Sequence, residues 1–399
     1  LLIAGVPQAG PVWVPALAWL ALWAVYLSIL NVGQIFYAFG WESLLVETGF
    51  YAIFLGSART FPPTVVLWLL RWLLFRLEFG AGLIKLRGGD PCWRDLSCLY
   101  YHHETQPMPN PLSWFFHRLP KPIHRMEVAG NHVAQLVVPF GLFAPQPIAS
   151  VAGLIVIAHQ SWLVLSGNFS WLNAATIALA FVALDDRRLG HVLPFHHGRL
   201  QPLPLPFAVL VIAFGVLVVT LSWWPLRNLL SRRQLMNASF NSLHLVNTYG
   251  AFGSITKERF EVVIEGTASP EAGPGAEWLA YEFKGKPGDP RRRPPQVAPY
   301  HLRLDWLMWF AAMSWPGEHR WIVALVDKLL QGDPGTLKLV RRNPFRDHPP
   351  ALIRASLYRY RYTSRAERRT TGAWWLRTWE GDYLPPSRLR VRPAAPGTP

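Results

Sequence analysis

Three ionisable side chains interrupt one long apolar segment at intervals of seven residues: Arg71, Glu78 and Lys85. At about 100° per residue, a step of seven drifts by only about 20°, so the three side chains share one helix face. A charge in lipid costs several kcal/mol unless it faces protein or water, so this face must point inward. Two interpretations remain open. Either the face forms a polar site in which Lys85 is a base or an anion anchor, or it is a buried ion pair that joins helices.

A connection rich in histidine, proline and aromatic residues follows, over 87–128. Its His102, His103 and Glu104, with His132 further on, are residue types that supply metal ligands or acid and base groups. Their spacing matches no zinc signature, so we predict no metal site and no cofactor. The aromatic residues of this connection also have a simple structural explanation, a position at the headgroup level of a membrane.

The chain has only two cysteines, Cys92 and Cys98. Two cysteines exclude both a disulfide-rich scaffold and a zinc site with four thiolates. They would form a disulfide if this segment faces an oxidising compartment, and would otherwise be two buried thiols.

Other chemistries lack their motifs. The sequence has no Gly-rich nucleotide loop and no GxSxG nucleophile elbow. Arginine runs at 291–293, 341–342 and 368–369 are explained more simply as solvated charges or contacts with anionic lipid than as a nucleic-acid site. We therefore expect membrane lipid, and no nucleic acid, among the partners.

The composition separates the chain into two halves. Of 399 residues, 51% are hydrophobic and 16% are charged, which excludes a disordered chain. Apolar segments long enough for the bilayer core predict a multi-pass α-helical membrane domain over 1–230, with six or seven spans. The expected spans lie at 12–36, 62–86, 147–165, 171–184 and 207–224, with 132–143 continuing the preceding segment and 42–55 as a short span or a re-entrant piece. The apolar opening residues have no basic start, so we expect a piece of a preceding span there and no signal peptide.

After residue 230 the apolar runs shorten, and Gly, Pro and Arg become frequent. We predict a soluble α+β domain over 231–385, β-rich and sandwich-like, and a disordered tail over 386–399. Alternation of Tyr and Arg over 357–362 is typical of a strand with one solvated face, and 260–265 and 278–284 also read as strands. Asp305 is expected to cap a helix over 306–313, and a second helix over 320–331 should end at Gly332.

Several long segments resemble the lipase maturation factor family. They are WESLLVETGFYAIFL at 41–55, PCWRDLSCLYYHHETQPMPNPLSW at 91–114, SGNFSWLNAATIAL at 166–179, LVNTYGAFGSITKERFEVVIEGT at 245–267, YEFKGKPGD at 281–289 and APYHLRLDWLMWFAAM at 298–313. The resemblance covers about 31–386. It implies a membrane-embedded maturation factor or chaperone, without enzyme activity, that assists folding and assembly of secreted dimeric lipases. A secreted lipase is then the expected protein partner.

The candidate binding residues lie within these segments, except for Asn131 and His132. The candidates are Arg94, Asp95, Glu104, Asn131, His132, Asn168, Asn247, Tyr249, Asp305, Trp306 and Trp309. For the aromatic members, an ordinary place in a hydrophobic core is the competing interpretation.

A more distant resemblance favours an alternative function. FGAGLIKL at 79–86 and HQSWLVLSGNFSWLN at 159–173 are similar to the membrane domain of the vitamin K-dependent γ-carboxylase family. That resemblance implies a membrane enzyme with Lys85 as base, near His102, His103 or the pair Arg94 and Asp95.

The family resemblance also predicts a location, the endoplasmic reticulum membrane, or the cytoplasmic membrane for a bacterial chain. Four crossings between the 87–128 segment and residue 224 put that segment and the carboxy-terminal domain on one side, which the resemblance places in the lumen or periplasm. The positive-inside rule prefers the opposite orientation, because Arg and Lys are more frequent on that side. We follow the resemblance, since a secreted client is met outside the cytosol.

Overall fold

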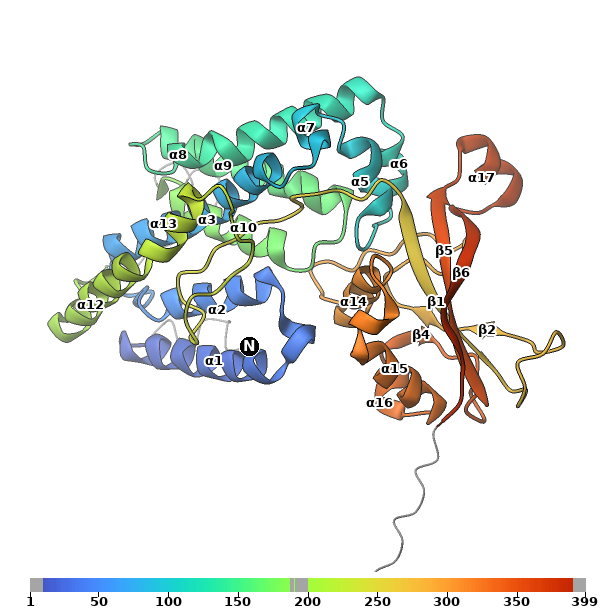
Figure 1. Ribbon diagram of the computed structural model, residues 1–399. Helices are drawn as coiled ribbons and strands as arrows, with labels where there is room; N and C mark the ends of the chain where they lie inside the picture. The colour runs from blue at the N-terminus through green and yellow to red at the C-terminus, as the bar shows by residue number, and fades with distance from the viewer. Residues whose placement is uncertain (1–9, 187–189, 191–199, 390–399) are drawn as a thin grey trace, which may run out of the picture. The chain divides into compact units, whose positions relative to one another are not determined.

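The computed structural model describes residues 10–186, 190 and 200–389 (Figure 1). Chain contacts divide it into two compact units. The first, here the membrane unit, comprises Leu1–Tyr100, Leu119–Leu165 and Phe169–Ile255 as far as they are described. The second, the carboxy-terminal unit, combines Tyr101–Arg118, Ser166–Asn168 and Thr256–Pro399 to the same extent. The boundary at residue 230 stays a prediction from composition.

The described part of the membrane unit is helical. Its helices are α1 (Trp13–Val32), η2 (Gln34–Tyr37), α2 (Gly40–Ala52), α3 (Thr64–Arg87), α4 (Pro91–Arg94), α7 (Lys121–Leu136), α8 (Val138–Gly141), α9 (Ile148–Ser166), α10 (Leu172–Ala180), η3 (Phe181–Ala183), α12 (Leu205–Leu221) and α13 (Trp223–Leu230). Three stretches are long and apolar enough to cross a membrane, Trp13–Val32, Ile148–Ser166 and Leu205–Leu230. The expected total of six or seven spans stays a prediction.

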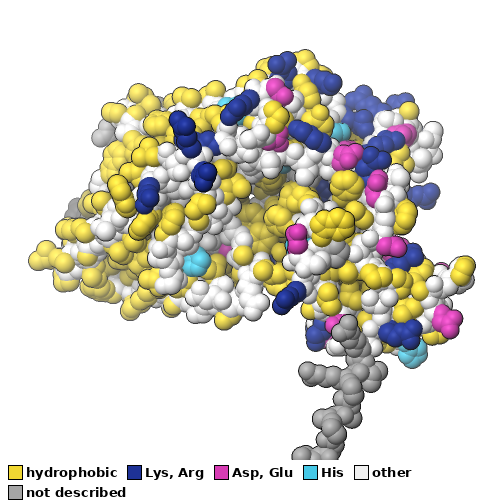
Figure 2. Space-filling model, viewed as in Figure 1, with side chains coloured by type: hydrophobic (Ala, Val, Ile, Leu, Met, Phe, Trp, Pro, Cys, Tyr) yellow, Lys and Arg dark blue, Asp and Glu magenta, His cyan; other side chains and the backbone are white. Residues whose placement is uncertain are grey.

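Helix α3 is the centre of the membrane unit, in contact with α7, α10 and α12. Its Leu69, Leu73 and Leu77 are buried, and so are Glu78 and Lys85 on the charged face. By contrast, α12 exposes apolar side chains such as Val209, Val216 and Val219. Figure 2 shows hydrophobic side chains on the surface in the region of α12. An uncharged helix with a bare apolar face is typical of contact with lipid, whereas α3 keeps its charges inside the helix bundle.

The carboxy-terminal unit combines strands and helices. Its helices are α6 (Ser113–His117), α14 (Arg303–Ala311), η4 (Pro316–Glu318), α15 (Arg320–Leu330), α16 (Pro334–Leu337) and α17 (Arg365–Thr371), and α5 (Leu99–Thr105) leads into it. Its strands are β1 (Arg259–Thr267), β2 (Leu279–Ala280), β3 (Glu282–Phe283), β4 (Val340–Arg342), β5 (Leu352–Tyr362) and β6 (Trp375–Ser387). Among the described residues, a four-stranded sheet has the order β2-β1-β5-β6, and β3 pairs with β4. All these pairings are antiparallel.

The sheet carries side chains of different character at its two ends. Toward one end, Val262, Ile264 and Ile353 pack with residues of α14 and α15 in one hydrophobic core. Toward the other, Tyr360 and Tyr362 pack with tryptophans in a separate aromatic cluster. Arg359 and Arg361, on either side of Tyr360, are exposed, which confirms the alternation predicted for this strand.

Some expected elements differ from the structure. The strand expected over 278–284 is divided between β2 and β3, which belong to different sheets. Helix α14 begins at Arg303, so Asp305 lies inside its first turn, and its prediction as the cap is wrong. The second helix ends as predicted before Gly332, whose φ of +64° suits a residue without a side chain. Strand β6 reaches Ser387, two residues into the expected disordered tail; 390–399 and the opening residues 1–9 lie outside the described residues.

Candidate functional site

The charged face of α3 is part of a buried chain of hydrogen bonds. Lys85 Nζ donates to Gln135 Oε1 at 2.6 Å, and Gln135 Nε2 donates to Glu78 Oε2 at 3.2 Å. The second carboxylate oxygen accepts Gln160 Nε2 at 2.5 Å, and Gln160 Oε1 accepts Asn173 Nδ2 at 2.7 Å. Helices α3, α7, α9 and α10 each contribute, so we call these five residues the amide relay. It links a buried lysine to a buried glutamate through a carboxamide.

The relay leaves Lys85 enclosed. Its side chain is 5% exposed, its ammonium also donates to Ala81 O at 3.3 Å, and it lies 5.2 Å from the ring centre of Trp93. Arg71, the third residue of the face, donates to the backbone oxygens of Val182 and Leu142. The three charged side chains therefore bind polar groups of other helices, and Lys85 and Glu78 are bridged by Gln135.

A second buried group surrounds Glu47 in α2. Its Oε2 accepts the backbone N–H of Asn247 at 2.9 Å, the Asn247 amide at 3.0 Å and the Tyr249 hydroxyl at 2.7 Å. The other oxygen pairs with Arg76 of α3, which also donates to Asn247 O at 2.5 Å. Asn247 and Tyr249, both candidate binding residues, thus lie inside a paired network that fastens the 245–249 segment to two helices.

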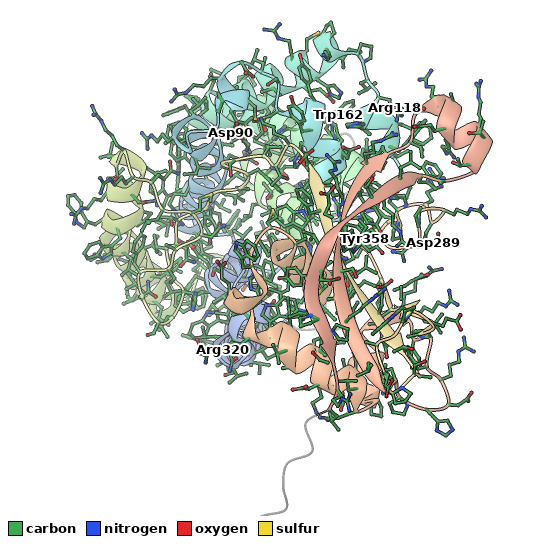
Figure 3. All side chains as sticks on the ribbon, turned by 45° about the vertical axis from the view of Figure 1, so that its right-hand side comes forward. Asp90, Arg118, Trp162, Asp289, Arg320 and Tyr358 are labelled. Carbon is green, nitrogen blue, oxygen red and sulfur yellow. A yellow bond between two sulfur atoms is a disulfide. The ribbon has the colours of Figure 1, made fainter. Side chains whose placement is uncertain are left out.

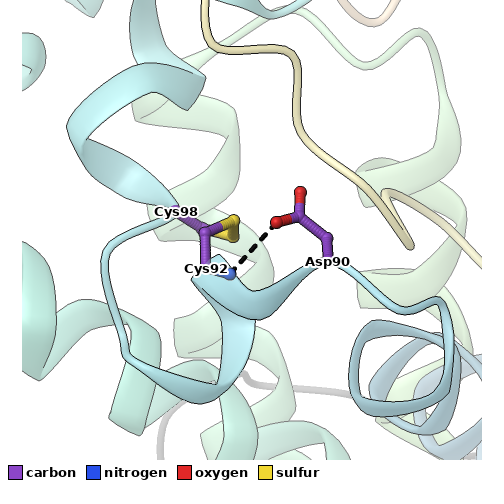
Figure 4. Close-up of side chains that lie close together, drawn as sticks. All are labelled: Asp90, Cys92 and Cys98. Atoms are coloured by element: carbon purple, nitrogen blue, oxygen red, sulfur yellow. Dashed lines mark hydrogen bonds between the residues drawn. A yellow bond between two sulfur atoms is a disulfide. The ribbon is translucent and has the colours of Figure 1, made fainter.

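The segment after α3 carries the disulfide Cys92–Cys98. Asp90 Oδ1 accepts the backbone N–H of Cys92 at 3.0 Å, which caps α4, and Asp90 Oδ2 accepts that of Ile255 at 2.8 Å (Figure 4). Both cysteines are buried. Bonded to each other, the two sulfurs are not available as thiolate ligands, although the carboxylate lies beside them.

Four further candidates of the membrane unit make local contacts. Arg94 donates to Leu86 O at 3.0 Å, and Asp95 accepts the N–H and the hydroxyl of Ser97. His132 Nε2 lies 2.9 Å from Trp93 O, and Asn131 Oδ1 lies 3.2 Å from a ring nitrogen of His159. Because Arg94 and Asp95 are exposed, they are the members of this set that a soluble partner can reach.

The carboxy-terminal unit has its own buried charges. Glu261 forms ion pairs with Arg259 and with Lys286, each with an N–O distance of 2.6 Å. Arg259 also donates to three backbone oxygens of the 101–118 segment, those of Glu104, Gln106 and Pro107. Buried ions with this many partners fix backbone segments in place.

Asp305 holds a turn. Its Oδ1 accepts the backbone N–H groups of Gly285 and Lys286 at 2.6 Å and 3.0 Å. Burial raises the pKa of this carboxyl, and the two N–H groups oppose that rise. Asp305 therefore joins α14 to the turn after β3.

Glu104, His102 and His103 belong to α5, and both histidines are buried. Glu104 Oε2 accepts the backbone N–H of Tyr362 at 2.6 Å, and burial raises the pKa of this carboxyl. Lys85 belongs to the membrane unit, whereas His102 and His103 fall in the carboxy-terminal unit.

Asn168 binds two backbone segments. Its Nδ2 donates to Pro109 O at 3.1 Å and Pro295 O at 2.9 Å, and its Oδ1 accepts the N–H groups of Val297 and Ala298 at 2.8 Å. The side chain is fully buried. A residue this completely paired has a structural task in the unit.

The two candidate tryptophans of α14 are also largely inside. Trp306 is buried, and Trp309 Nε1 donates to Thr105 O at 3.0 Å. The exposed aromatic residues nearby are different ones, above all Trp315 with 79% of its surface exposed.

Sequence reasoning missed the uncharged members of the amide relay, Gln135, Gln160 and Asn173, and the partners Glu47 and Glu261. A signal existed for the first three, because a Gln or Asn within an apolar helix needs a buried partner. Such a residue gives no hint of which partner it has, since the contacts join positions far apart in sequence.

Comparisons with known proteins cover most of the chain. Residues 2–191 match the model of the "Lipase maturation factor transmembrane domain", and residues 245–385 match that of the "Lipase maturation factor C-terminal domain". The chain is 48% identical to Lipase maturation factor 1 of Mus musculus, over 92% of this chain and 70% of that protein. It is 47% identical to Lipase maturation factor 1 of Homo sapiens, over 94% and 71%, and 30% identical to Lipase maturation factor 2 of Homo sapiens, over 92% and 68%. No solved structure matches the chain.

Proposed function

The chain belongs to the lipase maturation factor family, and we propose that it is a membrane-embedded factor that assists folding and assembly of a secreted, dimeric lipase. The observation that carries the proposal is the extent of the similarity. Nearly half of the residues are identical to a protein named Lipase maturation factor 1, and the identity runs through both units.

We propose further that the chain acts without catalysis of its own. The alternative, an enzyme with Lys85 as base, requires a lysine that can meet a substrate. Lys85 is instead enclosed by Gln135, Ala81 and Trp93, and it takes part in a relay that joins four helices. This supports a structural role for the charged face of α3.

Two features in combination support a proposal for the side of the membrane. Residues 101–118 fold into one compact unit with the chain after residue 256, so they lie on the same side of the bilayer. The disulfide Cys92–Cys98 ends three residues before Tyr101, and disulfides persist in oxidising compartments. We therefore propose that the carboxy-terminal unit faces the lumen of the endoplasmic reticulum, or the periplasm for a bacterial chain.

A chaperone must offer apolar surface to a client that has not yet buried its own. In the carboxy-terminal unit, Met313 and Trp315 follow α14 and are exposed. Trp306 and Tyr249 are buried, so a client reaches them only by displacing their packing. We propose Met313 and Trp315 as the place where a client's apolar surface is held.

The proposal is tested in cells that lack their own maturation factor and express a secreted lipase. The wild-type chain should restore secreted lipase activity. The double variant Met313→Ser/Trp315→Ser should lower that activity severalfold at equal abundance in membranes, because an exposed aromatic contact is the kind of residue that dominates protein binding. The matched control is Trp379→Ser in β6, an exposed tryptophan elsewhere in the unit, which should leave secretion unchanged.

The two parts of the proposal fail separately. If the wild-type chain at normal abundance does not restore secretion, the maturation role is refuted. If it does so and the double variant is equally active, the role stands and the assignment of the contact surface is wrong.

A further inference from the structure

Arginine and aromatic side chains gather at one end of the carboxy-terminal unit, around α6 and α17. We call this set the arginine–tryptophan patch and define it as Leu112, Trp114, Phe115, Arg118, Arg293, Arg365, Arg368, Arg369 and Trp374. Figure 2 shows dark blue side chains concentrated in this region, and Figure 3 shows Arg118 beside the hairpin end that carries α17.

The arginines of the patch are stacked on its tryptophans. The guanidinium carbon of Arg368 lies 3.5 Å from the ring centre of Trp374, and that of Arg293 lies 5.2 Å from the same ring. Arg118 lies 4.7 Å from the ring centre of Trp114, whose Nε1 donates to Thr363 O at 3.0 Å. Stacking holds the positive groups in place by cation–π attraction without neutralising their charge.

Acidic side chains near the patch are already paired. Glu367 accepts two hydrogen bonds from Arg361, at 3.0 Å and 2.7 Å, and completes the capping box of α17 with Ser364. Arg361 lowers the pKa of Glu367 to about 2. Glu104 is engaged by the backbone N–H of Tyr362. The five arginines of the patch therefore exceed the negative charge that remains to balance them.

Two of these arginines repel each other on the surface of the same helix. Arg365 and Arg369 stand four residues apart on α17, where like charges repel, and both are exposed. No hydrogen bond or ion pair of either side chain is found among the described residues. A helix that carries uncompensated like charges at this spacing is suited to an anionic partner outside the chain.

Exposed apolar side chains border the positive charges. Phe115 is 45% exposed and Leu112 is 39% exposed, and both flank Trp114. Arginine beside exposed aromatic and aliphatic groups is typical of surfaces at the boundary between headgroups and acyl chains. An acidic protein segment would use the charges but gives no reason for the bare Phe115 and Leu112.

We propose that the arginine–tryptophan patch docks the carboxy-terminal unit on a bilayer that contains anionic phospholipid. Its guanidinium groups match the planar, two-point hydrogen bonding of phosphate oxygens, and Phe115 and Leu112 enter the interface. Membrane-spanning helices in the same chain keep the local concentration of lipid high, so a weak contact suffices. The proposal is independent of which client the chain serves.

The test uses the full chain in nanodiscs made of phosphatidylcholine alone or mixed with phosphatidylserine. The variant Phe115→Cys carries an environment-sensitive fluorophore; the two native cysteines are bonded to each other and do not react. In discs with phosphatidylserine, the emission should shift to shorter wavelength, and lipids with nitroxide-labelled chains should quench it. Both effects should be severalfold smaller in phosphatidylcholine alone and should fade between about 0.1 M and about 1 M salt.

Two charge variants decide the source of the effect. Arg365→Gln/Arg369→Gln should abolish the shift and the quenching. The control Arg320→Gln/Arg346→Gln removes the same charge from exposed positions outside the patch and should change neither; Arg320 is labelled in Figure 3, far from Arg118. A second label at Leu112→Cys, with Phe115 intact, should give the same pattern, and thermal unfolding should be equal for all variants.

Three outcomes would overturn the proposal. The label could report the same environment in both kinds of disc, the patch and control variants could behave alike, or the label could remain in water in both discs and respond only to an added polyglutamate peptide. The last outcome would assign the patch to an acidic protein segment.

Discussion

Replacing Lys85 by Met tests whether the charged face of α3 is structural or chemical. Methionine is unbranched and only one heavy atom shorter than lysine, and it removes the charge, so Glu78 loses the positive group on the far side of Gln135. Removing one member of a buried ion pair costs about 3 to 5 kcal/mol, because the other charge stays buried without compensation. Glu78→Gln should cost a similar amount for the same reason.

The double variant Lys85→Met/Glu78→Gln gives the decisive comparison. Two hydrogen bonds, of 2.6 Å and 3.2 Å, and one amide group separate the two charges, which corresponds to a separation of about 7 Å. With an effective dielectric constant of about 20, their attraction is about 2 kcal/mol. The double variant should therefore be more stable than the sum of the single losses predicts, by about that amount.

The assay is thermal or denaturant unfolding of the purified chain in detergent, together with its abundance in membranes and the lipase activity that it restores. A structural relay predicts that secretion follows abundance in all three variants. Additive losses would refute the coupling through Gln135. Normal stability and abundance with no restored secretion in Lys85→Met would instead favour chemistry at this lysine.

Two further predictions concern the stability of the folded chain, one for Asp305 and one for the disulfide Cys92–Cys98. Burial raises the pKa of Asp305, so this carboxyl stabilises the fold at low pH, and that contribution is lost as the pH rises through the folded-state pKa. Asp305→Asn does not titrate there, so the melting temperature of this variant relative to that of the wild type should rise as the pH increases above about 4. A slope of the opposite sign would show that the N–H groups of Gly285 and Lys286 outweigh burial. The disulfide closes a short loop, which corresponds to about 2 kcal/mol of loop entropy, so Cys92→Ala/Cys98→Ala should unfold at lower temperature than the wild type, and reductant should lower the melting temperature of the wild type alone. Equal melting temperatures with and without reductant would mean that the bond adds no stability.

The sequence allowed the fold class to be predicted, because its strongest signals are local. Apolar length predicted a span over 207–224, which lies within the helical stretch Leu205–Leu230, and alternation of Tyr and Arg predicted the strand around Tyr360. The prediction for the start of α14 is wrong. Aspartate is a residue type that often caps helices, but the Asp305 carboxylate accepts a hydrogen bond from a turn 19 residues earlier. A local rule has no access to such a partner.

The candidate site was predictable only in part. The spacing of seven placed Glu78 and Lys85 on one inward face, and both are buried. It did not indicate that an amide from α7 lies between them, because a glutamine in an apolar segment has no characteristic spacing. Likewise, Asn168 and Tyr249 are candidates because they lie in long segments that resemble the family. Such segments resemble each other among relatives whether a residue binds a client or holds a turn.

The carboxy-terminal unit cannot be completed in the order in which the chain is synthesised. Arg259 finds three of its acceptors at residues 104–107, and Asn168 binds the backbone at 295–298. The ribosome makes these early segments long before their partners. The early segments therefore stay unpaired while the two or more helices that separate them from their partners in sequence are synthesised. A fragment that starts at residue 231 would lack them altogether, and Arg259 would lose three backbone acceptors and keep Glu261 as a partner. Any study of this half in isolation has to supply the short early segments as well.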